Sequence, residues 1–593
     1  MIKNRYMKKL LPYVFSILLS VGIANAQVKD SVRTYTLQEV NVSATTKNVK
    51  KNVLENVNGK TFFYEDPDRK LTMNPGVISI LPIITENRID NLPSDLSGLY
   101  YGNDMSIPIL GSKTQFQGAA SKVNSLLADM DVDMDVYSSA YNHIGGIKRI
   151  IPKKYSNTEV NVSGDFTDRK IIGAVADLDF LGFKINARGG YREISVFEWL
   201  KNAISSLELL PDVHEIDAEG TITKDKTSLE YYLTNSKQTQ RFKGDTYNIS
   251  EITQDTKYNF SVVKASTLLG DYVLKLAASN EFEGQESTNI YDGVETNVET
   301  GSRNFAINSE AEKRGDFKVG FAEYFFRNKN LKEISRDVAK VYFEKKIILE
   351  DILLEPSVSL SNFKTKNAPS VALRASYFFN SGELNFGVGR YSTFLFDNNT
   401  ILGVGTFSKG EERPYVGEHY FVSMKKEMNG FDADLSVFLK KFEFEYMSEG
   451  YSKGKSYGLR FKLDSTPLHS TLTAYVSGSE INGHKLAGAI DNDIQYYYWF
   501  NIGDLTINTN ITYRNGAYTK NNKRYSRLND AFSFSLGISK SIEMLGTEVN
   551  ISVTGFNLLG QTELLRRINQ QGNYISEKAP RWGNVMIDMK KSL

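Results

Sequence analysis

The densest set of side chains that could do chemistry is the acidic run at residues 129–136. It places four carboxylates two residues apart, at Asp129, Asp131, Asp133 and Asp135. Carboxylate oxygens at this density suit Ca²⁺, but the run lacks the loop glycine and the distal glutamate of a calcium loop. Side chains two apart share one face of a strand. We therefore predict a β-strand with one acidic face rather than a metal site.

Histidines and cysteines offer little support for other metal chemistry. No two of the five histidines have the spacing of metal ligands, and the chain has no cysteine, which also excludes disulfides. No serine stands in the Gly-x-Ser-x-Gly setting of a hydrolase nucleophile. We expect no catalytic residues, no metal and no cofactor.

Tyrosine, arginine and neighbouring polar residues are the candidates for binding a small molecule. We expect a polar and aromatic tip in a glycine-bounded turn, facing residues of long loops. Tyrosine with arginine suits an anionic chelate and equally suits stacking on sugars, so the ligand class stays open. For each residue the alternative is a solvated loop side chain. The candidates are Tyr100, Tyr101, Asn103, Asp104, Tyr518, Arg524 and Tyr525, with Arg566 and Arg567 as further loop residues.

The elements that would position these residues are β-strands. Apolar and polar residues alternate from about residue 157 to the last residue, for example over residues 504–513, which is typical of strands with one apolar face. A soluble sandwich shows the same alternation, so the connections decide. Tight turns, as at 429–431 and 502–504, are interleaved with longer connections near 194–213, 240–255, 283–301, 396–414, 482–490, 515–527 and 558–580. This asymmetry predicts an outer-membrane β-barrel of about 22 antiparallel strands, with the short turns in the periplasm.

The N-terminus agrees with an outer-membrane location. Basic residues precede an apolar run at 10–23, which ends in Ala24-Asn25-Ala26, a pattern that predicts a secretory signal peptide over residues 1–26. The run is shorter than the roughly 20 residues of a spanning helix. We expect a mobile segment at 27–36, a mixed α+β plug domain at 37–155 and the barrel at 156–593. The net charge of +1 gives no reason to expect a nucleic-acid partner.

Five short stretches of the expected mature chain carry recognisable motifs. They are residues 35–44 (YTLQEVNVSA), 144–152 (IGGIKRIIP), 513–518 (YRNGAY), 527–530 (RLND) and 553–559 (VTGFNLL). Together they resemble the TonB-dependent outer-membrane receptors, especially those of Bacteroidetes-type bacteria. The first resembles the Leu-x-Glu-Val-x-Val-(Ser/Thr)-Ala stretch that opens the plug there, and the second a late plug segment. The other three resemble a Tyr-x-x-Gly-x-Tyr strand end, the start of the next strand and the Asn-Leu-Leu element near the C-terminus.

The resemblance implies a plug inside the barrel and a TonB-type energy-coupling complex that pulls an N-terminal segment by strand addition. The first strand of the plug is an alternative role for the same residues. Outer-membrane lipid and a surface lipoprotein are further candidate partners. The expected energy-coupling contact is Leu37, Gln38, Glu39, Val40, Asn41 and Val42.

The end of the plug departs from the family, because residues 153–157 (KKYSN) run directly into the first barrel strand. The predicted function is active uptake of a scarce nutrient, namely an iron chelate, a vitamin or an oligosaccharide, across the cell outer membrane. The alternative is a non-transporting outer-membrane barrel with a binding or structural role.

Overall fold

The structure is a computed structural model of the 593-residue chain. The chain separates into residues 1–55 and 56–593 by its internal contacts, and only the second unit contains described residues. The predicted signal peptide, the segment 27–36 and the predicted energy-coupling contact lie outside them. The structure describes residues 77–79, 87–92, 97–101, 107–108, 128–133, 138–139, 145–152, 158–165, 170–194, 212–243, 249–291, 294–328, 335–394, 414–445, 451–486, 489–516, 518–521, 524–556, 558–559, 563–567, 574–578 and 582–592.

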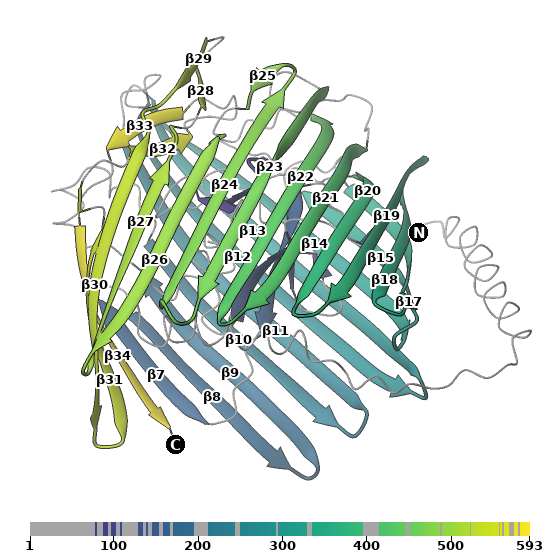
Figure 1. Ribbon diagram of the computed structural model, residues 1–593, viewed down its shortest axis with the longest axis horizontal. Helices are drawn as coiled ribbons and strands as arrows, with labels where there is room; N and C mark the ends of the chain where they lie inside the picture. Colours follow the sequence, from purple (N-terminus) through teal and green to yellow (C-terminus); the bar gives the residue numbers. More distant parts are fainter. Residues whose placement is uncertain are drawn as a thin grey trace, which may run out of the picture. The chain divides into compact units, whose positions relative to one another are not determined.

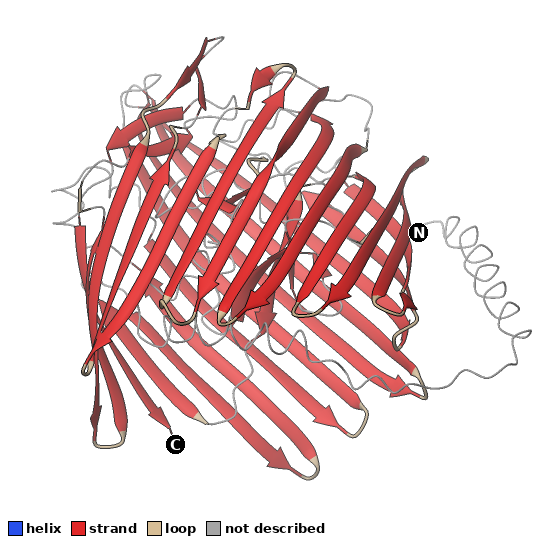
Figure 2. Ribbon diagram, in the orientation of Figure 1, coloured by secondary structure: helices blue, strands red, loops and turns tan. Residues whose placement is uncertain are grey.

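Most of these residues form one closed antiparallel β-barrel (Figures 1 and 2). The last strand pairs with the first, with Ile587 opposite Gly164. In chain order the wall consists of β7 (Glu159–Asp165), β8 (Lys170–Phe180), β9 (Phe183–Ile194), β10 (Asp212–Lys224), β11 (Thr227–Lys243), β12 (Ile249–Leu269), β13 (Tyr272–Tyr291), β14 (Val294–Lys313), β15 (Phe317–Asn328), β16 (Ser335–Lys345), β17 (Ile347–Leu349), β18 (Ile352–Phe363), β19 (Lys366–Phe379), β20 (Gly382–Thr393), β21 (Tyr415–Met428), β22 (Phe431–Glu445), β23 (Tyr451–Ser465), β24 (Ser470–Ile481), β25 (His484–Lys485), β26 (Asn492–Ile502), β27 (Leu505–Arg514), β30 (Ala531–Met544), β31 (Thr547–Phe556) and β34 (Trp582–Ser592).

The number of spanning strands follows from this order. Within the described wall, β17 continues β16 after the single residue Lys346, and β25 is a two-residue arm on the end of β24. Counting each of these with its neighbour leaves 22 of the 24 segments as spanning strands. The predicted fold class, a transmembrane barrel of about 22 antiparallel strands, is confirmed.

Smaller sheets account for the other described strands. One sheet has the order β4-β3-β6-β5, in which β3 and β6 are parallel. The described residues include no helix, so the helical component predicted for residues 37–155 stays a prediction. The strands are β1 (Val77–Ser79) with β2 (Asn87–Ile89); β3 (Ser97–Tyr101), β4 (Ile107–Pro108), β5 (Ala128–Asp133) and β6 (Gly146–Pro152); β28 (Tyr518–Asn521) with β29 (Arg524–Arg527); and β32 (Glu563–Arg567) with β33 (Tyr574–Lys578).

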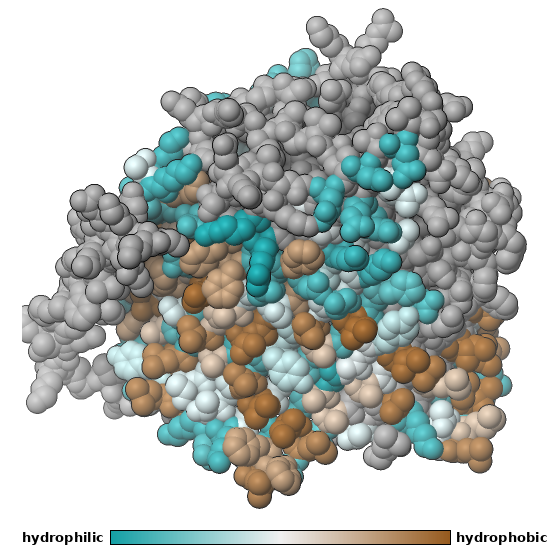
Figure 3. Space-filling model, turned by 180° about the vertical axis from the view of Figure 1, so that it is seen from behind, coloured by the Kyte–Doolittle hydropathy of each residue, from teal (hydrophilic) through white to brown (hydrophobic). Residues whose placement is uncertain are grey.

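The wall is apolar outside and polar inside. On β10, Ile216 is 55% exposed on the outer face, whereas Glu215 and Asp217 on either side of it are each 2% exposed on the inner face. Figure 3 shows hydrophobic residues gathered over the lower part of one outer face, with hydrophilic residues above them. Such an apolar outer band around a polar interior is the arrangement of outer-membrane barrels. The protein is therefore an outer-membrane barrel.

No helix among the described residues is long and apolar enough to cross a membrane.

The tight turns predicted from the sequence are present on one side of the barrel. At Asn429-Gly430 the two φ values are 48° and 85°, and at Leu545-Gly546 they are 55° and 70°. Two successive left-handed residues make the primed hairpin turns whose twist matches that of the flanking strands. Local turn chemistry thus sets the register of these strand pairs.

Two predicted long connections are wrong. Residues 240–255 lie mostly in strands, because β11 continues to Lys243 and β12 begins at Ile249. Residues 283–301 lie mostly in strands, because β13 continues to Tyr291 and β14 begins at Val294. Both faces of the ladder over residues 283–301 carry mostly polar residues, for example Glu286 paired with Glu299 on one face and Gln285 paired with Thr300 on the other. Strands with water on both faces need no alternation, so the sequence pattern disappears where the strands leave the apolar band.

Candidate functional site

A tight turn after β2 forms the centre of the candidate site. Asp90 and Asn91 have left-handed φ values of 53° and 62°, and Leu92 follows. Asp and Asn tolerate this conformation better than most residues, but it still carries strain that the surroundings must hold. All three residues are fully buried. We call residues 90–92 the latch turn.

Two cations of the barrel wall bind the carboxylate of the latch turn. Arg460 on β23 donates two hydrogen bonds to Asp90, from Nε to Oδ1 at 2.8 Å and from Nη2 to Oδ2 at 2.5 Å. The Nζ of Lys440 on β22 lies 2.6 Å from Oδ2. All three side chains are at most 2% exposed, so the charges stabilise one another without water. The Arg460 guanidinium also lies 4.3 Å from the ring centre of Phe438, which favours a buried cation.

The other two residues of the latch turn extend the contact. The amide of Asn91 donates to Ser477 Oγ and to the Ile490 carbonyl, both at 2.7 Å, and accepts from the Ile490 N–H at 3.0 Å. Leu92 belongs to an apolar cluster of the wall and of the segment after β25. The members packed with it are Ala372, Tyr391, Phe442, Ile481, Leu486 and Ala489.

Other inner segments contact the wall at separate places. Lys440 Nζ donates to the Gly145 carbonyl at 3.0 Å, next to β6, and the Ser139 N–H donates to Ser357 Oγ on β18 at 2.9 Å. The short strand β4 contacts β13 and β14. The wall side chains in these contacts are buried on the inner face, so the described segments that make them lie against the inside of the barrel (Figure 1).

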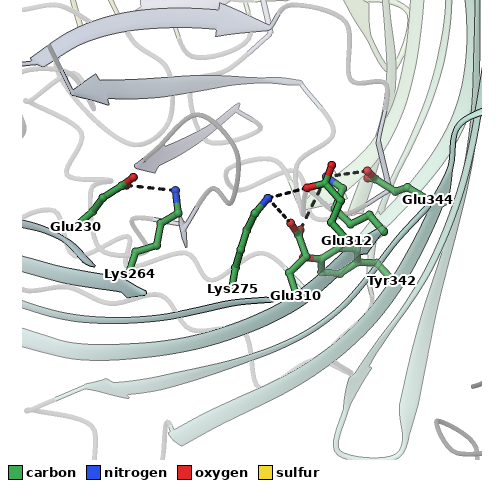
Figure 4. A network of polar contacts seen from close by, with 8 residues as sticks. Glu230, Lys264, Lys275, Glu310, Glu312, Tyr342 and Glu344 are labelled. Atoms are coloured by element: carbon green, nitrogen blue, oxygen red, sulfur yellow. Dashed lines mark hydrogen bonds and ion pairs between the residues drawn. The ribbon is translucent and has the colours of Figure 1, made fainter. Parts of the chain in front are cut away.

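Ion pairs line the inner wall between β11 and β16 (Figure 4). Lys275 lies 3.0 Å from Glu310 and 2.8 Å from Glu312, and both partners come from β14. The side chains point from the wall into the interior, as polar residues must in a barrel whose outside faces lipid. Further pairs are Lys264 with Glu230 at 3.2 Å and Lys318 with Glu344 at 2.9 Å.

Gly320 on β15 leaves room for a side chain of β16 to reach across this strand to β14. A Cβ added at Gly320 on β15 would lie 2.0 Å from the ring of Tyr342, whose hydroxyl donates to Glu310 at 2.9 Å. We expect Gly320→Ala to displace this buried ring and to lower the free energy of unfolding by about 1–3 kcal/mol. Urea unfolding of the purified barrel, followed by its heat-dependent mobility on a gel, measures the change. Gly173→Ala is the matched control, since its nearest neighbour would be 3.8 Å away; an equal effect of both substitutions would contradict the prediction.

The structure places the predicted ligand-binding residues in two groups. Tyr100 and Tyr101 lie within β3, paired with β4 and β6, and not in a turn as predicted; Asn103 and Asp104 are outside the described residues. Tyrosine favours strands, which accounts for the longer strand. The loop residues are in hairpins, Tyr518 in β28, Arg524 and Tyr525 in β29, and Arg566 and Arg567 in β32.

Tyr518 is the predicted residue that the structure connects to the latch turn. Its hydroxyl donates to Asp491 at 2.8 Å, and its N–H donates to the Ala489 carbonyl at 3.1 Å. Its side chain packs against the apolar cluster that contains Leu92. The segment 489–491 thus contacts both a predicted ligand residue and the latch turn.

Two motifs noted in the sequence meet at the base of the same loop. The Gly516 N–H donates to Asp530 Oδ1 at 3.1 Å, the Tyr513 hydroxyl donates to Oδ2 at 2.9 Å, and Arg527 pairs with the same carboxylate. The Gly516 N–H and the Tyr513 hydroxyl hold the pKa of Asp530 below its usual range. We call these four residues the loop clasp.

The loop clasp requires glycine at residue 516, because an added Cβ would lie 1.7 Å from the Leu528 carbonyl oxygen. We expect Gly516→Ala to open the clasp and to increase trypsin cleavage within residues 518–527 severalfold. Since the pKa of Asp530 is lowered on folding, the stability that the clasp contributes is present at neutral pH and is lost as the pH falls through the lowered value. Unchanged cleavage in Gly516→Ala, with Gly173→Ala as the reference, would show that the loop holds its shape without the clasp.

The latch turn itself was not predicted from the sequence. Its local signal is the Asp-Asn pair, which favours turns and left-handed φ values. Nothing local indicates that Arg460 and Lys440, some 370 and 350 positions later, bind that turn. The acidic run at 129–136 is a strand as predicted where described, over β5. In the described part of the chain no group of three or more His, Asp or Glu side chains is arranged to hold a metal ion.

Comparisons with known proteins agree on the fold. The structure matches a ferric enterobactin receptor mutant of Pseudomonas aeruginosa (TM-score 0.68, 13% identity, 89% of this chain and 96% of that chain). It also matches the siderophore receptor PirA of Acinetobacter baumannii, with a TM-score of 0.69 and 12% identity over 89% of this chain and 96% of that chain. A third match is the FrpB iron transporter of Neisseria meningitidis, with a TM-score of 0.66 and 10% identity over 89% of this chain and 96% of that chain.

At the level of sequence, no family model matches the chain, and no curated protein matches it. The similar structures are those of receptors and a transporter, not of enzymes. Identities of 10–13% show a shared fold. The chain therefore has the β-barrel fold of the TonB-dependent outer-membrane receptors that its motifs resemble.

Proposed function

We propose that this protein is a TonB-dependent outer-membrane receptor that imports an iron chelate of the siderophore class. The observation that carries the proposal is the latch turn, which is buried against the inner wall of a closed barrel. A segment held there by buried ion pairs must move before a solute of siderophore size can pass. The similarity of the fold to siderophore and iron receptors supports an iron chelate over a vitamin or an oligosaccharide.

In this proposal residues 37–155 are the plug and residues 156–593 the barrel. The energy-coupling complex binds residues 37–42 by adding a strand, because strand addition needs only backbone N–H and C=O groups. Pulling on this segment supplies the work that releases the latch turn from Arg460 and Lys440. Outer-membrane lipid surrounds the barrel, and a surface lipoprotein is a candidate lid.

The ligand contacts we propose are the residues predicted from the sequence, Tyr100, Tyr101, Asn103, Asp104, Tyr518, Arg524 and Tyr525. Tyr518 supports a link between ligand and plug, since the segment 489–491 that it binds also binds Asn91. A ligand that shifts Tyr518 would change the contacts of the latch turn. Binding outside would then prepare the plug for release.

Uptake of radiolabelled ligands by whole cells tests the proposal. The host is a strain without its other outer-membrane iron receptors, and the probes are a ferric catecholate, a ferric hydroxamate, cobalamin and a maltooligosaccharide. We expect energy-dependent uptake of one of the two iron chelates, lost in the deletion strain. Uptake of only cobalamin or the oligosaccharide would support a transport function but contradict an iron chelate as the ligand. No uptake of any probe by a surface-exposed protein would favour the non-transporting barrel.

A further inference from the structure

The outer wall of β20–β24 carries a row of charged side chains at one edge of the apolar band. Cross-strand pairing places one residue from each strand in this row. The next two rows toward the short turns are apolar or aromatic. Because short turns face the periplasm in such barrels, the charged row marks the extracellular edge of the membrane. The row is Arg390, Glu418, Lys441, Lys455 and Glu480, and the exposed side chains below it include Val388, Tyr420, Tyr457, Phe386, Val422, Val437, Leu459 and Val476.

Two depressions adjoin each other across this edge. The lower one, of about 430 Å³, is lined almost entirely by apolar atoms. The upper one, of about 340 Å³, has seven charged residues among the twelve that line it. The residues that line the two depressions are consecutive outward-facing positions of the same strands. Val388 and Leu439 line the lower depression, and Arg390 and Lys441, two residues further along the same strands, line the upper. A single elongated molecule could therefore occupy both.

Two lysines stand directly opposite each other in the charged row. Lys441 on β22 pairs with Lys455 on β23, and their side chains are 55% and 46% exposed. Like charges directly opposite each other destabilise an antiparallel pair. An anionic group bound between the two ammonium groups would relieve this repulsion.

The surrounding charges leave the patch positive. Lys455 pairs with Glu480 at 2.6 Å, and Lys441 lies 4.0 Å from Glu418. With Arg390 and the pair of Lys453 with Glu443 at 2.7 Å, the upper depression has four basic and three acidic side chains. The ammonium groups of Lys441 and Lys455 also lie 5.7 and 5.6 Å from the ring centres of Tyr420 and Tyr457, in the row below.

We propose that this face binds a phosphate-bearing lipid of the extracellular leaflet. The phosphate lies between Lys441 and Lys455, where it relieves their repulsion, and an acyl chain lies in the apolar depression. An acyl chain in bulk lipid is already shielded from water, so it gains no hydrophobic free energy by entering this depression. Selectivity over other lipids therefore comes from the headgroup. Free phosphate is not the occupant, since half-exposed lysines with carboxylate neighbours bind an anion weakly in water.

Native mass spectrometry of the full-length protein in a non-ionic detergent tests the site. The probes are dioleoyl phosphatidic acid, dioleoyl glycerol, which has the same chains without the phosphate, and inorganic phosphate. We expect phosphatidic acid to remain bound and the other two to be lost. The variant Lys441→Gln/Lys455→Gln should bind phosphatidic acid about tenfold more weakly.

The control is Lys257→Gln/Arg327→Gln, which removes two exposed cations elsewhere on the barrel, each of which forms an ion pair with an acidic side chain. It should bind like the wild type, and unchanged heat-dependent mobility would show that both variants fold. Three results would overturn the proposal. They are equal affinity of the two double variants, retention of dioleoyl glycerol as strong as that of phosphatidic acid, and displacement of the lipid by millimolar phosphate.

Discussion

Asp90→Asn is expected to release the latch turn and to open the lumen of the barrel. The substitution removes the carboxylate that both Arg460 and Lys440 bind, and these two side chains are only 2% and 1% exposed. Removing one partner of a buried ion pair costs about 3–5 kcal/mol, because the remaining charge stays buried and unpaired. Single-channel recordings in planar bilayers measure the result. We expect the wild type to stay closed and the variant to show frequent openings.

Hydrogen exchange gives a second measure of the same change. Amides of residues 87–92 should exchange faster in Asp90→Asn, while those of the barrel strands keep their protection. Asp434→Asn is the control, because Asp434 pairs with Lys425 at 3.9 Å on the exposed surface, where such pairs contribute about 0–1 kcal/mol.

A compensated variant separates charge from shape. The triple variant Asp90→Ala/Arg460→Met/Lys440→Met removes all three charges. It should restore much of the closed state, because apolar residues often replace a buried ion pair without loss of stability. If Asp90→Asn stays as closed as the wild type, the ion pairs do not hold the latch turn. Closure would then rest on Leu92 and Asn91.

Val40→Pro is expected to reduce ligand uptake to the level of the deletion strain while leaving surface binding within about twofold of the wild type. Proline has no backbone N–H, and strand addition depends on those groups. The barrel lies more than 100 residues further along the chain and should fold unchanged. Uptake and binding of the same radioactive ligand on whole cells measure the two effects separately.

Val40→Ala is the control for this substitution, because it shortens the side chain and keeps the N–H. It should transport like the wild type. Uptake by Val40→Pro at the wild-type rate would move the energy-coupling contact away from residues 37–42. If growth on every limiting nutrient is unchanged both by this substitution and by complete deletion, the transport proposal fails and the non-transporting barrel becomes the better account.

The barrel wall could be predicted from the sequence because each strand pairs mainly with its neighbours in the chain. Alternation identifies which face of β27 meets lipid, and pairs such as Asn429-Gly430 identify the tight turns. The predicted connection at 283–301 was wrong because β13 and β14 continue beyond the apolar band. Over 283–301 both faces of the ladder carry mostly polar residues, so the strands continue without an alternating pattern that reveals them.

Contacts between distant segments were decided only by the tertiary structure. Asp90 meets Arg460 across 370 positions, and Gly516 meets Asp530 because the loop turns back on itself. An inward arginine on a barrel strand looks the same in sequence whether it faces water, a ligand or a plug. Its partner depends on which part of the inner segments packs beside β22–β24. That packing is set by the shape and charge of the whole lumen, which no local spacing of residues encodes.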